Sequence, residues 1–143
     1  MQRSPQVVVL DTNIVLDLFV FRDVATAPLL QALQDRALDW ISTAPMREEL
    51  ERVLAYPQIV PRLALYKLQA GDVLAAFDRH ARIVDAAPKA PVSCSDADDQ
   101  IFIDLAVAHQ AWLLSKDQAV LSMQKRLLAL GARVLSAIKS VAS

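Results

Sequence analysis

The sequence predicts an α/β fold, a three-layer α/β/α sandwich in which helices cover both faces of a central parallel sheet of four to five strands. Three observations lead to this prediction. Short, continuous apolar runs bounded by turn residues are typical of strands buried on both faces. Stretches with apolar residues at helical spacing separate these runs. The two patterns alternate along the chain, as the crossover connections of a parallel sheet require.

The first part of the chain contains two of the predicted strands. The run VVVL ends in Asp-Thr-Asn, and the run LDWIS ends just before Thr43, which can cap a helix that has Pro45 in its first turn. The predicted elements are, in order, a strand over 6–10, helices over 13–21 and 23–36, a strand over 38–42 and a helix over 44–55.

The remaining chain continues the alternation. Gly131 is placed to end a helix, and the Pro-containing stretch 85–95 is the longest predicted loop, too short to separate two domains. We therefore expect one domain over 1–143. The predicted elements here are helices over 61–66 and 72–81, a strand over 82–85, a helix over 98–109, a strand over 111–114, a helix over 118–130 and a strand over 132–135.

The composition excludes several classes of function. A chain of 143 residues with 55% hydrophobic residues can bury a core of ordinary size. Its 16 acidic and 15 basic residues give a net charge of −1, which excludes nucleic-acid binding by a large basic excess. Its two glycines exclude Gly-rich phosphate loops. Any nucleic-acid role must therefore depend on a local site.

The cysteine count and the charge spacing indicate the compartment. Cys94 is the single cysteine, so neither an intrachain disulfide nor a thiolate metal cage can form. The first ten residues lack a signal sequence, and no stretch without charge exceeds 11 residues, so we expect no membrane span. These features predict a cytoplasmic protein.

Acidic residues follow or precede the predicted elements at one edge of the sheet. Asp11 and Asp117 come after strands, Glu48 and Glu49 lie in the helix after the second strand, and acids at 96, 98 and 99 begin another helix. The carboxyl ends of parallel strands form the ligand-binding edge of such sheets. Crowded carboxylates are stabilised by a bound cation, and oxygen ligands select Mg²⁺ or Mn²⁺. Such cations activate water in phosphodiester cleavage.

Four ordered motifs resemble those of the PIN-domain family. VVLDTN at 8–13 resembles its first motif, and REELERVL at 47–54 resembles the second, with a Glu before a Leu. CSDADDQIFIDLA at 94–106 resembles the third, an Asp seven residues before an Ala, which Asp99 and Ala106 match. LLSKD at 113–117 resembles the fourth. The resemblance extends from Val7 to about Leu135.

This resemblance implies a metal-dependent ribonuclease that cleaves single-stranded RNA, often the toxin of a toxin–antitoxin pair. It implies an antitoxin partner and a homo-oligomer, such as a dimer. Many relatives carry a further acid two residues after the last Asp, where this chain has Ala119. The implied metal ligands are Asp11, Glu49, Asp99 and Asp117, and the residues implied to line or orient the site are Thr12, Asn13 and Ser115.

Several acids have alternative interpretations. Asp11 could cap the first helix, and Glu48 competes with Glu49, although Glu49 borders the apolar stripe of its helix. Asp96 and Asp98 suit the first turn of a helix, where acids favour the dipole, and Asp96 could also line the site. Asp104 lies outside that first turn, and we expect it at the surface.

Basic residues near these motifs are candidates for binding RNA phosphates. Arg47 and Arg52 flank Glu49, and Lys116 precedes Asp117. The alternative is that they lie on solvated helix faces.

Two alternative functions are weighed. A phosphatase-like domain that uses Asp11 as its nucleophile usually has a second Asp two residues later, where this chain has Asn13. A PIN-like module that binds RNA or protein without cleaving is compatible with Ala119.

Overall fold

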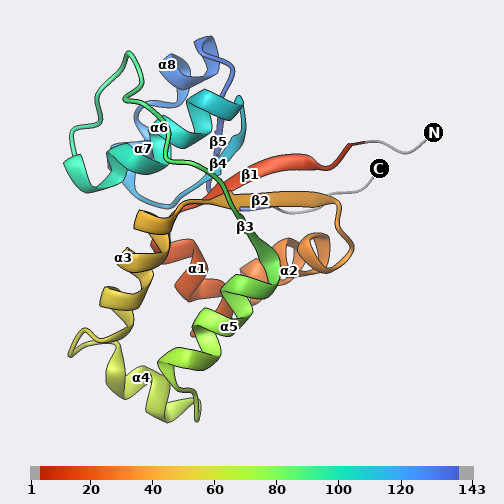
Figure 1. Cartoon of the computed structure of the whole chain (residues 1–143), viewed down its shortest axis with the longest axis vertical. Helices are drawn as coiled ribbons and strands as arrows, with labels where there is room; N and C mark the ends of the chain where they lie inside the picture. The colour runs from red at the N-terminus through yellow and green to blue at the C-terminus, as the bar shows by residue number, and fades with distance from the viewer. Residues whose placement is uncertain (1–3, 139–143) are drawn as a thin grey trace.

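The central sheet is the feature that positions every candidate site residue. The computed structural model describes residues 4–138 and contains a sheet of five parallel strands in the order β3-β2-β1-β4-β5 (Figure 1). This arrangement confirms the predicted α/β sandwich. The strands are β1 (Gln6–Leu10), β2 (Leu38–Ser42), β3 (Ala81–Ile83), β4 (Trp112–Leu114) and β5 (Arg133–Leu135).

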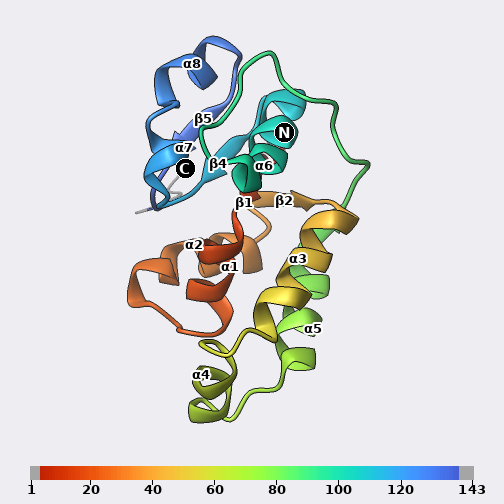
Figure 2. The same cartoon turned by 90° about the vertical axis from the view of Figure 1, so that its left-hand side faces the viewer.

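Helices cover both faces of this sheet. In Figure 1, α1 to α5 lie on one side of it and α6 to α8 lie on the other, and Figure 2 shows α3 beside α5. The helices are α1 (Thr12–Phe19), α2 (Ala27–Gln34), α3 (Ala44–Leu54), α4 (Val60–Leu65), α5 (Ala70–His80), α6 (Gln100–His109), α7 (Gln118–Leu121) and α8 (Gln124–Ala129), with short 3₁₀ turns η1 (Val24–Thr26) and η2 (Ala97–Asp99). Within residues 4–138, no helix has both the length and the apolar character needed to cross a membrane.

Alternate residues of β1 are buried in two separate cores. Val8 and Leu10 pack with α1, α2, α3 and α5, whereas Val9 packs with α6, α7 and α8. Both faces are apolar because a parallel strand between two helix layers meets no water. On β2, Trp40 is 1% exposed and makes an edge-to-face contact with Phe77, at 5.0 Å between ring centroids.

The strand order places a crevice beside β1. The chain runs outward from β1 through β2 to β3, then returns to β4 on the other side of β1. Such a switch in strand order opens a ligand-binding crevice at the carboxyl ends of the strands. Asp11 follows β1 and Ser115 follows β4, and the backbone N–H of Asp11 donates to the carbonyl of Leu114 at 3.1 Å.

Several predicted boundaries differ from the structure. The helix predicted over 118–130 is two helices, because the chain turns at Met123, whose buried side chain enters the core. The helix predicted over 23–36 opens with the 3₁₀ turn η1, where the Asp23 side chain accepts from the N–H of Ala25. The strand predicted over 82–85 is β3, which begins at Ala81 and ends at Ile83.

The sequence predicts Asp104 at the surface, and this prediction is wrong. Its side chain is 9% exposed on the inner side of α6. Its Oδ1 accepts from the N–H of Ala90 and from Nε2 of Gln100, both at 2.8 Å. One donor lies in the loop before α6 and the other one turn earlier on α6, and the contact with the loop is one that helical spacing within α6 does not indicate.

Candidate metal centre

Asp11 lies at the centre of the candidate site. It is 2% exposed and caps α1, since its Oδ1 accepts from the backbone N–H of Ile14 at 2.9 Å. Its Oδ2 accepts from Oγ of Ser115. Burial raises the pKa of Asp11, and these two hydrogen bonds counteract part of that rise. The capping interpretation is thus correct locally, and it leaves the carboxyl at the wall of a cavity.

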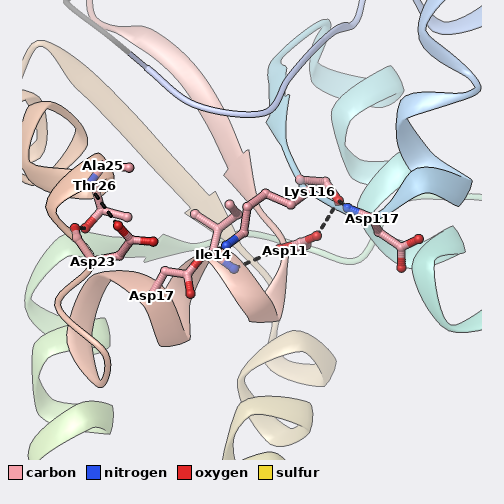
Figure 3. A network of polar contacts seen from close by, with 9 residues as sticks. Asp11, Ile14, Asp17, Asp23, Ala25, Thr26, Lys116 and Asp117 are labelled. Atoms are coloured by element: carbon pink, nitrogen blue, oxygen red, sulfur yellow. Dashed lines mark hydrogen bonds and ion pairs between the residues drawn. The ribbon is translucent and has the colours of Figure 1, made fainter.

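Ser115 joins Asp11 to the loop that carries Asp117. It is fully buried, and its Oγ accepts from the N–H of Asp117 at 3.0 Å while donating to Asp11. Asp117 in turn caps α7, because its Oδ1 accepts from the N–H of Ala119 at 2.9 Å. Figure 3 shows Asp11 between the start of α1 and the loop of Lys116 and Asp117. One hydroxyl therefore fixes the spacing of two acids from adjacent strand ends.

Glu49 reaches the same place from α3. Thr43 caps this helix, with its Oγ1 accepting from the N–H of Met46 at 3.4 Å, and Leu50 is buried beneath it. Glu49 is half-buried, and its Oε2 accepts from Oγ1 of Thr12 at the start of α1. Glu48 is exposed. The structure thus brings Glu49, and not Glu48, against the first motif.

The start of α6 supplies two further carboxylates. One carboxylate oxygen from each of Asp96, Asp99 and Asp117 lies within 4.8 Å of the other two. Among residues 4–138, the buried Oδ2 of Asp99 has no hydrogen-bond partner. Burial, followed by the adjacent carboxyl of Asp117, raises the pKa of Asp99 to about 7. Asp98 is exposed, and Asp96 accepts from its N–H at 3.0 Å.

These side chains line one cavity of about 320 Å³. Its wall contains the five acids described above and two of the residues predicted to line the site, Thr12 and Asn13. Ser115, also predicted to line the site, is buried and does not reach the wall. The predicted residues at the wall are Asp11, Thr12, Asn13, Glu49, Asp96, Asp99 and Asp117. An all-oxygen donor set with one buried, unpaired oxygen suits a hard divalent cation such as Mg²⁺ or Mn²⁺.

Sequence reasoning missed the rest of this wall. Tyr56, Gln58 and Ile59 line it from the segment after α3, with apolar residues of three helices. Pro57 marks the end of α3 in the sequence, but nothing in the local pattern indicates that the chain then stays beside the first motif. The apolar residues contributed by helices are Leu16, Val53 and Phe102.

The three basic candidates lie outside this set. Arg47 donates to both carboxylate oxygens of Asp78 on α5, at 2.8 and 2.9 Å, and contacts Glu51 at 3.4 Å. Lys116 forms an ion pair with Asp17 of α1. Arg52 is exposed on α3. Of the described residues that line the cavity, none is a Lys or Arg.

Comparisons with known proteins agree with this fold. A family model described as "PIN domain" matches residues 7–119. Among solved structures, the chain is similar to one in the crystal structure of VapBC2 from Rickettsia felis bound to a DNA fragment from their promoter. The TM-score is 0.62 at 14% identity, over 91% of this chain and 98% of that chain. No curated protein matches the sequence.

Proposed function

The chain belongs to the PIN domain family, and from this membership we propose that it is an endoribonuclease that depends on Mg²⁺ or Mn²⁺ and cleaves single-stranded RNA. The observation that carries the proposal is the convergence on one cavity of carboxylates from the residue after β1, from α3, from the segment that leads into α6 and from the loop after β4. Members of this family are generally nucleases. The acids at this cavity are the ligand type that divalent-metal nucleases use.

The proposed ligands are Asp11, Glu49, Asp99 and Asp117, with Asp96 beside them. The buried oxygen of Asp99 supports this assignment, because an unpaired buried carboxylate oxygen is unfavourable unless a cation or proton satisfies it. When bound, the cation would polarise a water molecule and neutralise charge on the phosphate. Asp96 offers a carboxylate oxygen within 4.8 Å of one from Asp117, in a chain that has Ala119 where many relatives carry a further acid.

Other residues orient these acids. Ser115 holds Asp11 and Asp117 together, and Thr12 holds Glu49. Because Ser115 donates to Asp11, this hydrogen bond favours the ionised form of Asp11, which is the form that binds cations. No side-chain nucleophile is needed for this reaction.

We further propose that the chain acts with an antitoxin partner and self-associates in the cytoplasm. The support is the similarity of its fold to a chain of the Rickettsia felis VapBC2 structure, together with family membership. A neighbouring gene for a small DNA-binding protein would support the pairing, and a monomeric mass in light scattering would contradict self-association.

The activity is tested by incubating single-stranded RNA with the full chain in Mn²⁺, in EDTA, and as the Asp11→Asn variant. We expect cleavage in Mn²⁺ that EDTA abolishes and that the variant lowers at least a hundredfold, because Asp11 is central to the site. Equal cleavage with EDTA or in the variant would overturn the proposal. RNA binding without cleavage would favour the alternative, a non-cleaving PIN-like module, for which Ala119 is the supporting feature.

A further inference from the structure

The cavity that holds the acids also has a neutral wall that the metal site does not use. Tyr56 and Gln58, whose side chains carry an aromatic ring and an amide, line it together with the aliphatic residues Val53 and Ile59. Its volume of about 320 Å³ lies at the small end of ligand pockets, which span roughly 300–1,000 Å³. The cavity thus has room beside the carboxylates for a group that is flat and uncharged.

The backbone holds Tyr56 in place while its side chain faces solvent. Its N–H donates to the carbonyl of Val53 at 3.0 Å, and its carbonyl accepts from the N–H groups of Ile59 and Val60 at 2.9 and 3.0 Å. Pro57 follows it and restricts its backbone dihedrals. The Tyr56 side chain nevertheless belongs to a residue that is 43% exposed. An aromatic surface is therefore presented on a fixed backbone at the mouth of the site.

Two of the basic residues near the site are paired with acids, so an uncharged aromatic surface is a suitable way to bind RNA there. Arg47 and Lys116 are already paired with acids, so they offer little free charge to RNA phosphates. Base stacking on an aromatic ring strengthens single-strand binding by about ten- to a hundredfold and needs no positive charge. The amide of Gln58 carries both a donor and an acceptor, which can pair with a base edge.

We propose that Tyr56 and Gln58 form a subsite for one unpaired nucleobase of the RNA strand, next to the phosphate at the carboxylates. This inference rests on the proposed nuclease function. The base stacks on Tyr56 and its edge faces Gln58. Because a base inside a duplex is already stacked and paired, the subsite selects single-stranded RNA.

The binding test uses a short single-stranded RNA that carries one 2-aminopurine at successive positions, and its fluorescence is read immediately after mixing, before the RNA is cleaved. In Mn²⁺, we expect the full chain to quench the fluorescence of 2-aminopurine at one position. Tyr56→Phe should keep this quenching, whereas Tyr56→Ala should lose it and bind about tenfold more weakly. Tyr66→Ala is the matched control, because Tyr66 is similarly exposed on the chain but lies after α4 and does not line the cavity.

A second measurement changes the RNA, so its first comparison uses only the wild-type chain. Replacing the nucleotide at that position by an abasic one should weaken binding to the wild-type chain about tenfold. The abasic change should have little further effect on Tyr56→Ala, because both changes remove the same stacking contact. Equal affinity for abasic RNA at every position, or quenching that persists in Tyr56→Ala, would overturn the subsite.

Cleavage kinetics separate this proposal from the nuclease proposal. If the wild-type chain cleaves RNA, Tyr56→Ala should raise KM about tenfold and leave kcat within about threefold. Cleavage by Tyr56→Ala with an unchanged KM would overturn the subsite and leave the nuclease intact. Failure of the wild-type chain to cleave would overturn the nuclease, while the binding measurements would still decide whether a base stacks on Tyr56.

Discussion

Asp99 is the residue whose protonation should dominate the pH dependence of the metal-free chain. Its pKa is about 7 in the folded chain, against roughly 3.9 for an unfolded Asp. Between these values the folded chain binds a proton that the unfolded chain lacks, so the free energy of unfolding falls as pH rises from about 4 to 7. Asp11, whose pKa is also raised, contributes in the same direction.

We therefore expect the Tm of the metal-free chain to fall between pH 5.5 and pH 8. The Asp99→Asn variant should show a smaller fall in Tm. The difference should correspond to a change in the free energy of unfolding on the order of 1 kcal/mol, because solvent screens the charge of a group that is only partly buried. Thermal denaturation at the two pH values measures the effect. Asp98→Asn is the control and should keep the wild-type fall; an undiminished fall in Asp99→Asn would contradict the assignment.

Ser115 is the residue that connects two strand ends through one buried hydroxyl. Ser115→Ala removes the donor to Asp11 and the acceptor for the N–H of Asp117. Leaving such buried groups unpaired costs about 1–3 kcal/mol. Urea denaturation should show this loss. Ser122→Ala, at an exposed serine that bonds only its own turn, should cost under about 0.5 kcal/mol; equal losses in both variants would contradict the role given to Ser115.

At the scale of elements, α3 decides which of two adjacent glutamates reaches the site. Glu49 accepts a hydrogen bond from Thr12 at the start of α1, while Glu48, one position away, is exposed. Glu49→Gln should lower kcat/KM in limiting Mn²⁺ at least tenfold, because it removes one charged ligand. Glu48→Gln should stay within about twofold. A larger effect of Glu48→Gln would mean that the helix presents the other face to the metal.

The elements also show which features the sequence could predict. The strand endings at Asp11 and Ser115 and the cap of α3 at Thr43 have local signals, so the sheet and the carboxylate edge were predictable. The burial of Asp104 was not, because its donor Ala90 is distant in sequence. Nor was the Tyr56 wall, which depends on where the chain goes after α3 ends. Local spacing specifies an element and its cap, whereas the partners of a side chain depend on tertiary packing.

At the scale of the whole molecule, the net charge of −1 is the sum of acidic and basic residues that lie in different places. Five acids gather at one cavity, and two of the nearby basic residues are paired with other acids. Without a cation, this cavity would repel a phosphate. Under the proposed function, the chain would therefore act on RNA at the cavity only when a divalent cation offsets the carboxylates.

Binding of Mn²⁺ to the full chain, measured by calorimetry at pH 7.5, tests this account most directly. We expect the wild-type chain to bind Mn²⁺ and to release protons as carboxyls such as Asp99 ionise. Asp99→Asn should weaken binding at least tenfold, and Asp98→Asn, one residue away and exposed, should bind as the wild type does. A wild-type chain that binds no Mn²⁺, or an Asp99→Asn variant that binds it equally well, would contradict the account.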